Sequence, residues 1–215
     1  MVRTVVFDYD GTIVKRSYTY EFFKKFNKSK ICGGIINLAI KKYMEWEISL
    51  PLEQLAYPLL LYCLKGVAVD EIENYIEKTT TFYLIPGIKN IIKETKKRGI
   101  KVGIVSENIQ FQPRKAAELL DLDFVVSNEV EVKDGIITGK IYRFSRKNIM
   151  IEKVCEQFSL NYGEIFYVGD DVILSRKIKC LLFNPKRRND KKKVDNNRCF
   201  LIKDLYQFLS LIETK

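Results

Sequence analysis

A short apolar run near the start of the chain ends in two carboxylates, and this stretch restricts the possible folds more than any other. Residues 2–7 are rich in β-branched side chains and too few for a helix, which predicts a buried strand. Asp8 and Asp10 follow this strand, at the end where an open α/β sheet binds its ligand. Their mutual repulsion requires a cation or a shared proton. Gly11 then allows a sharp exit from the strand.

Length and charge leave several classes of ligand open. The 215 residues suit one large domain or a domain with an insertion. The formal net charge of +10 favours an anionic ligand, such as a phosphate ester, a nucleic acid or an acidic membrane, without choosing among them. The chain has no histidine, which excludes Ser-His-Asp triads, HExxH zinc sites and histidine general bases.

Cysteine spacing and hydropathy predict a cytoplasmic protein without a membrane partner. The first apolar run is too short for a signal peptide, and no stretch approaches the roughly 18 uncharged apolar residues of a membrane span. The cysteines show neither a disulfide framework nor a zinc pattern, so we expect most to be small buried hydrophobes in a reducing compartment. They are Cys32, Cys63, Cys155, Cys180 and Cys199.

Residues 15–81 are expected to form a helical cap domain inserted after the first strand. Apolar spacing in this segment predicts only helices. The expected helices cover residues 18–26, 31–46, 51–64 and 70–78. Asp70 with Glu73 three residues later predicts a capping box at the last of them.

The remainder of the chain, residues 1–14 and 82–215, is expected to form an α/β core domain. Strands are predicted at residues 100–105, 123–127, 165–168, 180–183 and 200–202, and helices at 87–98, 113–120, 145–158, 170–178 and 204–212. This alternation predicts a doubly wound, mostly parallel, Rossmann-like sheet. Asp134-Gly135 between residues 129–132 and 136–140 predicts a β-hairpin.

Polar residues follow three of the predicted strands. Asp8 and Asp10 are joined by Ser106 and by the pair Asp170-Asp171, and parallel strands bring their carboxyl ends to one edge. Carboxylates from two strands suit Mg²⁺, whereas a hydroxyl, backbone N–H groups and a lysine suit an anion. Such a site has what phosphoryl transfer needs.

Four motifs in order make the chain resemble the haloacid dehalogenase superfamily of phosphatases. They are DxDGT at residues 8–12, Ser106 after an apolar strand, Lys147 at a helix start, and Gly169-Asp170 after a strand. The hairpin segment 127–140 and the helical insertion are most similar to the phosphoserine-phosphatase-like branch. Taken alone, Lys147 has basic neighbours that could fill its place, and its position in the series favours it.

The resemblance implies a Mg²⁺-dependent phosphatase of small phosphorylated metabolites. Asp8 would be the nucleophile that forms an aspartyl-phosphate, and Asp10 would protonate the leaving group and then activate water. The implied phosphate-binding residues are Thr12, Ser106, Glu107, Asn108 and Lys147. The implied metal ligands are Asp8, Asp10 through its carbonyl, Asp170 and Asp171. Asp171 equally suits a helix N-cap.

Departures from the branch leave the substrate open. Ser17 stands where phosphoserine members carry a glutamate, with Glu21 one turn later. Glu107 and Asn108 replace two glycines, and Leu174 replaces an acidic residue. Phosphoserine specificity is therefore not expected. The altered fourth motif supports an alternative, a non-catalytic or regulatory member that binds phosphorylated ligands. The basic loop 186–193 carries no interleaved aromatics, which argues against nucleic acid, and the oligomeric state is not predicted.

Overall fold

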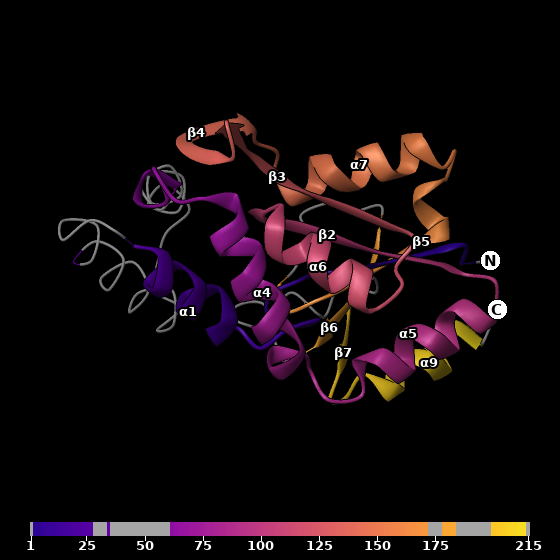
Figure 1. Cartoon of the computed structure of the whole chain (residues 1–215). Helices are drawn as coiled ribbons and strands as arrows, with labels where there is room; N and C mark the ends of the chain where they lie inside the picture. Colours follow the sequence, from indigo (N-terminus) through magenta and orange to yellow (C-terminus); the bar gives the residue numbers. More distant parts are fainter. Residues whose placement is uncertain (1, 28–33, 35–60, 172–177, 184–198, 214–215) are drawn as a thin grey trace.

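The computed structural model describes residues 2–27, 34, 61–171, 178–183 and 199–213. These residues contain a seven-stranded sheet in the order β4-β3-β2-β1-β5-β6-β7 (Figure 1). Neighbouring strands are parallel except β3 and β4, which form the antiparallel hairpin. The strands are β1 (Thr4–Phe7), β2 (Lys101–Ile109), β3 (Phe124–Lys133), β4 (Ile136–Arg143), β5 (Ile165–Gly169), β6 (Lys179–Phe183) and β7 (Cys199–Ile202).

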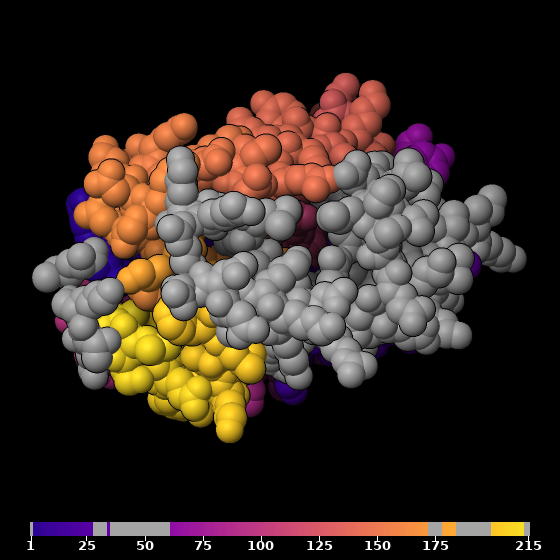
Figure 2. Space-filling model, turned by 180° about the vertical axis from the view of Figure 1, so that it is seen from behind, coloured from indigo at the N-terminus to yellow at the C-terminus, as the bar shows by residue number. Residues whose placement is uncertain are grey.

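Helices cover both faces of this sheet, so the predicted doubly wound α/β class is confirmed. Along β1, Val5 and Phe7 belong to one buried cluster and Val6 to another, because successive side chains of a strand point to opposite faces. Helices α5, α6 and α9 contribute to the first cluster and α7 to the second. From behind, the orange surface lies in the upper part of the molecule and the yellow C-terminal surface in the lower part (Figure 2). The helices are α1 (Ser17–Phe26), α4 (Val69–Tyr83), α5 (Ile88–Lys97), α6 (Phe111–Leu119), α7 (Lys147–Gln157) and α9 (Tyr206–Glu213), with a 3₁₀ turn, η1, at Tyr162–Glu164.

The hairpin forms where the sequence predicts it, and its strands are longer than expected. Asp134 and Gly135 have φ angles of 49° and 73°, the left-handed pair that a two-residue hairpin turn requires. β3 joins the two strands expected at residues 123–127 and 129–132. β2 continues through Ser106 to Ile109, with a shift in its register against β3 over these residues.

The predicted capping box at Asp70 is wrong. α4 begins at Val69, with Ala68 as its N-cap and no side-chain cap hydrogen bond. The backbone of the hairpin supplies the missing partner instead, because the Val69 N–H donates to the carbonyl of Gly135 at 2.8 Å. A long-range backbone contact has therefore replaced the local one that the sequence suggested.

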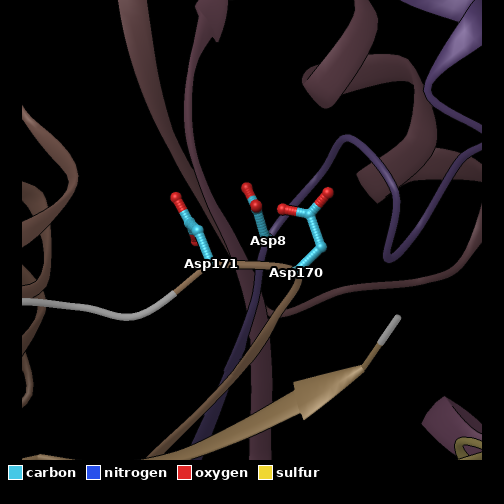
Figure 3. Close-up of side chains that lie close together, drawn as sticks. All are labelled: Asp8, Asp170 and Asp171. Atoms are coloured by element: carbon cyan, nitrogen blue, oxygen red, sulfur yellow. The ribbon is translucent and has the colours of Figure 1, made fainter. Parts of the chain in front are cut away.

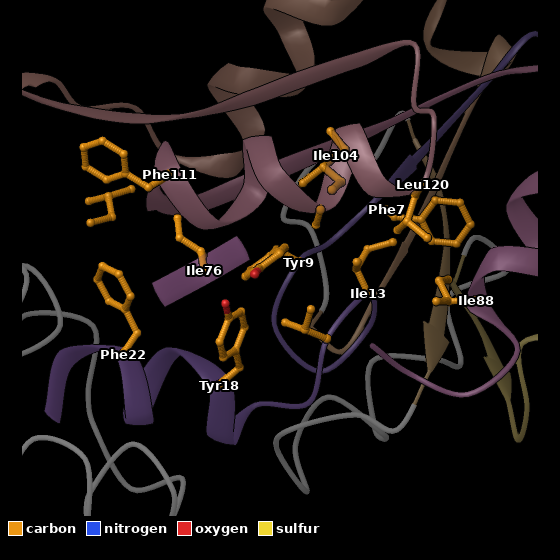
Figure 4. Close-up of a cluster of buried hydrophobic side chains, with 14 of the residues drawn as sticks. Phe7, Tyr9, Ile13, Tyr18, Phe22, Ile76, Ile88, Ile104, Phe111 and Leu120 are labelled. Atoms are coloured by element: carbon orange, nitrogen blue, oxygen red, sulfur yellow. The ribbon is translucent and has the colours of Figure 1, made fainter. Parts of the chain in front are cut away.

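The described cap helices share one buried cluster with the sheet (Figure 4). Tyr18 of α1 stacks on Tyr83 of α4 with ring centroids 4.5 Å apart. The two connections to the core run side by side, since the Lys15 N–H donates to the Tyr83 carbonyl at 2.8 Å and the Ile85 N–H to the Ile13 carbonyl at 2.9 Å. The division into residues 15–81 and the rest stays a prediction. Most of the expected helices at 31–46, 51–64 and 170–178, and the whole loop 186–193, lie outside the described residues.

The cysteine expectation is wrong for Cys180 and Cys199, which form a disulfide. They are 19 residues apart in the sequence but occupy facing positions on β6 and β7, a pairing that spacing alone does not show. Cys63 is disulfide-bonded as well, whereas Cys155 is a buried free thiol as expected. The cytoplasmic location stays a prediction. Among the described helices, none has the length and apolar character needed to span a bilayer.

Gly103 on β2 gives a test of this packing. A Cβ placed there would lie 2.4 Å from the Phe124 ring, which is itself packed against Phe158. We expect Gly103→Ala to lower the free energy of unfolding by about 1–3 kcal/mol, because the ring must be displaced. Urea denaturation of Gly103→Ala beside Gly163→Ala checks this, since a Cβ at Gly163 meets no atom within 4 Å. Equal stability of the two variants would contradict the packing described.

Candidate active site

Register places the predicted carboxylates at one edge of the sheet. Phe7, the last residue of β1, pairs with Ile104 of β2 and Val168 of β5. The next residue, Asp8, continues this alignment, because its N–H donates to the Val168 carbonyl at 2.8 Å. Asp170 and Asp171 follow the end of β5. In Figure 3 the three carboxylate groups lie side by side, with Asp8 between the other two.

Asp8 is buried and held by two contacts. Its Oδ1 accepts a hydrogen bond from the N–H of Tyr9 at 2.8 Å. Its Oδ2 lies 2.9 Å from Nζ of Lys147, a charge contact without the alignment of a hydrogen bond. A buried carboxylate requires such a cation, since desolvation disfavours its charged form.

Lys147, the first residue of α7, joins three side chains at the site. Besides Asp8, its Nζ lies 3.0 Å from both carboxylate oxygens of Asp171 and 3.0 Å from the Tyr167 hydroxyl. That hydroxyl donates to Oδ1 of Asp171 at 2.6 Å. Burial raises the pKa of Tyr167 well above its usual value, and the negative charges of Asp171 and Asp8 add to this. Tyr167 therefore remains a protonated donor at neutral pH.

A second cation, Arg16, comes from the connection between β1 and the cap. Its Nε donates to Oδ2 of the fully buried Asp170 at 2.7 Å. Gly11 makes room for this pair, because a Cβ there would lie 2.3 Å from that Asp170 oxygen and 2.7 Å from the Arg16 nitrogen. Its φ of +77° also favours glycine. The glycine of the first motif is thus required by both space and backbone conformation.

Asp10 contacts α1 and the end of β2 rather than the other carboxylates. Its Oδ1 accepts a hydrogen bond from the Thr19 hydroxyl at 2.6 Å, and its Oδ2 lies 3.5 Å from Nδ2 of Asn108. The Asn108 N–H in turn donates to the hydroxyl of Ser106 at 3.1 Å. Asp8 and Asp10 therefore have different surroundings, which suits them to different roles.

The other predicted phosphate-binding residues lie near this edge with distinct partners. Ser106 and Thr12 are buried, and within the described part of the chain the Thr12 hydroxyl has no hydrogen-bond partner. Glu107 accepts a hydrogen bond from the backbone N–H of Lys147 at 2.9 Å. This placement favours a structural role for Glu107 over the expected phosphate contact, because a carboxylate repels a phosphoryl group.

Sequence reasoning missed Arg16, Thr19 and Tyr167. Arg16 and Thr19 belong to a basic and aromatic stretch whose pattern suggests only a cap helix. Tyr167 lies within a buried strand, where a tyrosine is expected simply to pack in the core. The available signal was the hydroxyl of Tyr167, a polar group on a buried strand residue next to the fourth motif, because such a group usually has a hydrogen-bond partner.

The carboxylate cluster fits a divalent cation. One oxygen each from Asp8, Asp170 and Asp171 lie within 4.8 Å of one another. Carboxylate oxygens are the ligands that Mg²⁺ prefers. Among the residues that the structure describes, Lys147 and Arg16 are the cations that contact these three carboxylates. Of the three carboxylates, Asp171 is the one most engaged with Lys147.

Comparison with known proteins decides the family. The sequence profile described as haloacid dehalogenase-like hydrolase matches residues 5–172. The chain belongs to this family. The phosphoserine phosphatase of Methanocaldococcus jannaschii is 25% identical over 218 residues, which cover 98% of each chain. That of Archaeoglobus fulgidus is 27% identical over 192 residues, 86% of this chain and 53% of the relative.

Solved structures agree on the fold of this haloacid dehalogenase-like hydrolase. A substrate-bound phosphoserine phosphatase complex has a TM-score of 0.74 at 23% identity, and a phospho-aspartyl intermediate analogue of phosphoserine phosphatase has 0.72 at 24%. Each covers 98% of both chains. The resemblance to the phosphoserine-phosphatase-like branch is therefore confirmed, and the family to which the chain belongs is one of hydrolases.

Tyr167 offers a test of the site that does not depend on activity. We expect Tyr167→Phe to lower the free energy of unfolding by about 1–3 kcal/mol, because Asp171 and Lys147 lose a buried hydroxyl. Tyr142→Phe is the matched control, since 70% of Tyr142 is exposed, and we expect it to stay within about 0.5 kcal/mol of the wild type. Urea denaturation at neutral pH measures both. An unchanged Tyr167→Phe would show that the hydroxyl does not support the cluster.

Proposed function

We propose that this protein hydrolyses small phosphate monoesters with Mg²⁺, through an aspartyl-phosphate formed on Asp8. The observation that carries the proposal is the cluster of Asp8, Asp170 and Asp171 at one edge of the sheet, with Lys147 against the first and last of them. The phosphoserine phosphatase relatives and a phospho-aspartyl intermediate analogue of one such enzyme support it. A cytoplasmic location is part of the same proposal.

Charge explains how the cluster would act on a phosphate ester. Asp8, Asp170 and the carbonyl of Asp10 would hold Mg²⁺, with Asp171 as a further candidate ligand. The ion would neutralise the phosphoryl oxygens and so permit a carboxylate to approach them. Lys147 would supply a second positive charge from the side of α7, and Ser106 with Thr12 would donate hydrogen bonds to the same oxygens.

The two aspartates of the first motif would divide the reaction between them. Asp8 attacks phosphorus, and the bond from phosphorus to the leaving oxygen breaks. Asp10 gives that oxygen a proton, then takes one from the water that hydrolyses the aspartyl-phosphate. The contrast in surroundings supports this division, since Lys147 contacts Asp8 while neutral Thr19 and Asn108 contact Asp10.

The substrate would be a small phosphorylated metabolite. Phosphoserine is the substrate that the names of the relatives give, and this chain differs from their pattern near the site. Ser17 begins α1, and Glu107 with Asn108 follow Ser106, where they contact α7 and Asp10. Because Ser17 stands at the position of the glutamate that would bind the substrate amine, we expect a leaving group other than serine.

One contact favours a second candidate, a regulatory protein that binds phosphorylated ligands without turnover. The Arg16 guanidinium bonds to Asp170, which is a ligand of the proposed metal site. A guanidinium in this place would bind an anion as well as neutralise the carboxylate. The first prediction below separates these functions, and the second tests whether Arg16 competes with a metal ion at Asp170.

Asp8→Asn tests the proposed nucleophile. We expect it to abolish hydrolysis in a panel of phosphate monoesters with Mg²⁺, because an amide does not form the aspartyl-phosphate. Asp134→Asn in the hairpin turn is the control, and we expect wild-type rates, since Asn-Gly suits the same turn. An undiminished rate in Asp8→Asn would refute Asp8 as the nucleophile. Wild-type protein that binds an ester without turnover would favour the regulatory candidate.

Arg16→Met tests whether the guanidinium competes with the metal. We expect the variant to bind Mg²⁺ about tenfold more tightly, because a unit charge a few ångströms away is worth about 1–4 kcal/mol. Isothermal titration calorimetry without substrate measures this. Arg98→Met is the control, since Arg98 bonds to the Leu209 carbonyl near the opposite edge of the sheet. Unchanged or weaker Mg²⁺ binding by Arg16→Met would count against competition at Asp170.

A further inference from the structure

Two side chains outside the metal cluster hold the carboxyl group of Asp10. We propose that Thr19 and Asn108 are positioning residues that orient the carboxyl group of Asp10 for its acid–base role, with Oδ1 bound by Thr19 and Oδ2 assigned to proton transfer. Thr19 comes from α1 and Asn108 from the end of β2, so this pair, the Asp10 clamp, joins the cap to the sheet. The inference rests on the proposed function, because it concerns the acid–base role of Asp10.

The direction of the hydrogen bonds in the Asp10 clamp follows from their chemistry. Nδ2 of Asn108 lies 2.8 Å from the Thr19 hydroxyl oxygen, and an amide nitrogen only donates. The hydroxyl therefore accepts that hydrogen and gives its own to Oδ1 of Asp10, 2.6 Å away. Thr19 has one hydroxyl hydrogen, so Asn108 donates to Thr19 and Thr19 donates to Asp10.

The backbone fixes the orientation of the Asn108 amide. Its Oδ1 accepts a hydrogen bond from the Ile109 N–H at 2.9 Å, which leaves Nδ2 directed toward Thr19. The same nitrogen lies 3.4 Å from Oε1 of Gln112. A flipped amide would lose the Ile109 bond and place two acceptors against each other, so the direction of the clamp is fixed.

This order separates the two oxygens of Asp10. Oδ1 receives a short hydrogen bond from Thr19, and the unprotonated oxygen of a carboxylic acid is its better acceptor. We therefore assign proton transfer to Oδ2 rather than to Oδ1. Oδ2 lies 3.5 Å from Nδ2 of Asn108, at the limit of a hydrogen bond, so Asn108 acts mainly through Thr19.

Packing of α1 determines where the Thr19 hydroxyl lies. The neighbouring Tyr18 stacks on Tyr83, and its hydroxyl bonds to Thr79 at 2.9 Å and Thr80 at 2.8 Å on α4. These contacts fix the rotation of α1 about its axis, and with it the direction of Thr19. Asp10 is consequently oriented for proton transfer only while α1 lies against the sheet.

Leaving-group dependence separates this role from simple cap stability. p-Nitrophenolate departs without a proton, whereas the alkoxide of an alkyl phosphate requires one from the general acid. The ratio kcat/KM covers the steps up to departure of the leaving group. Misorientation of Asp10 should therefore lower kcat/KM for an alkyl phosphate and leave that for p-nitrophenyl phosphate almost unchanged, while a distorted cap should lower both.

The experiment compares Thr19→Val, Thr19→Ser and the control Thr95→Val on propyl phosphate and p-nitrophenyl phosphate with Mg²⁺. We expect Thr19→Val to lower kcat/KM about tenfold on propyl phosphate and less than about twofold on p-nitrophenyl phosphate, as a partial loss of general acid catalysis. Thr19→Ser keeps the hydroxyl and should restore the propyl phosphate value. Thr95→Val removes a buried hydroxyl that bonds only to the Ile91 carbonyl of its own helix, α5, so it should change the two kcat/KM values equally or not at all.

Other outcomes overturn the inference. Equal losses on both esters in Thr19→Val would assign Thr19 a structural role, and no loss would remove it from the reaction. If Thr19→Val fails to fold by circular dichroism, Asn108→Leu carries the same comparison with the same expected selectivity. A wild-type protein that hydrolyses neither ester would overturn the proposed function itself, which distinguishes that failure from failure of the Asp10 clamp alone.

Discussion

Repulsion among buried carboxylates is the constraint on which the rest of this structure depends. Asp8 and Asp170 are almost fully buried beside each other, and such a pair persists only where cations compensate its charge. Lys147 approaches from α7 and Arg16 from the connection to the cap. The carboxylate oxygens of Asp8 and Asp170 thus determine the positions of both α7 and the connection to the cap.

The hairpin contributes to this balance by placing the start of α7. Asn128 on β3 donates to the Glu107 carbonyl at 2.6 Å, and its Oδ1 accepts from the Ser145 N–H at 2.7 Å. Glu107 then accepts from the N–H of Lys147 at 2.9 Å. These bonds join the end of β2, β3 and the first turn of α7. They fix the backbone at Lys147, and thereby the place from which its side chain reaches Asp8.

Local patterns predicted much of the architecture, and non-local contacts account for the errors. The strand before Asp8, the turn at Asp134-Gly135 and the helix beginning near Lys147 all follow from short-range physics. The expected cap at Asp70 failed because a hairpin carbonyl satisfies the helix start, and the cysteine expectation failed because strand pairing aligned distant positions. In each failure a long-range partner replaced the local one.

By itself the sequence determined which residues stand at strand ends, because buried apolar runs and the glycines after them are local features. It therefore indicated Asp8, Asp10, Ser106 and Asp170, and the four motifs assigned them to a family. Only the tertiary structure decided which side chains they meet. Arg16 bonds to Asp170 across 154 residues, and Thr19 meets Asn108 across 89. Sheet register and helix rotation set these contacts, and both arise from packing of the whole chain rather than from any single segment.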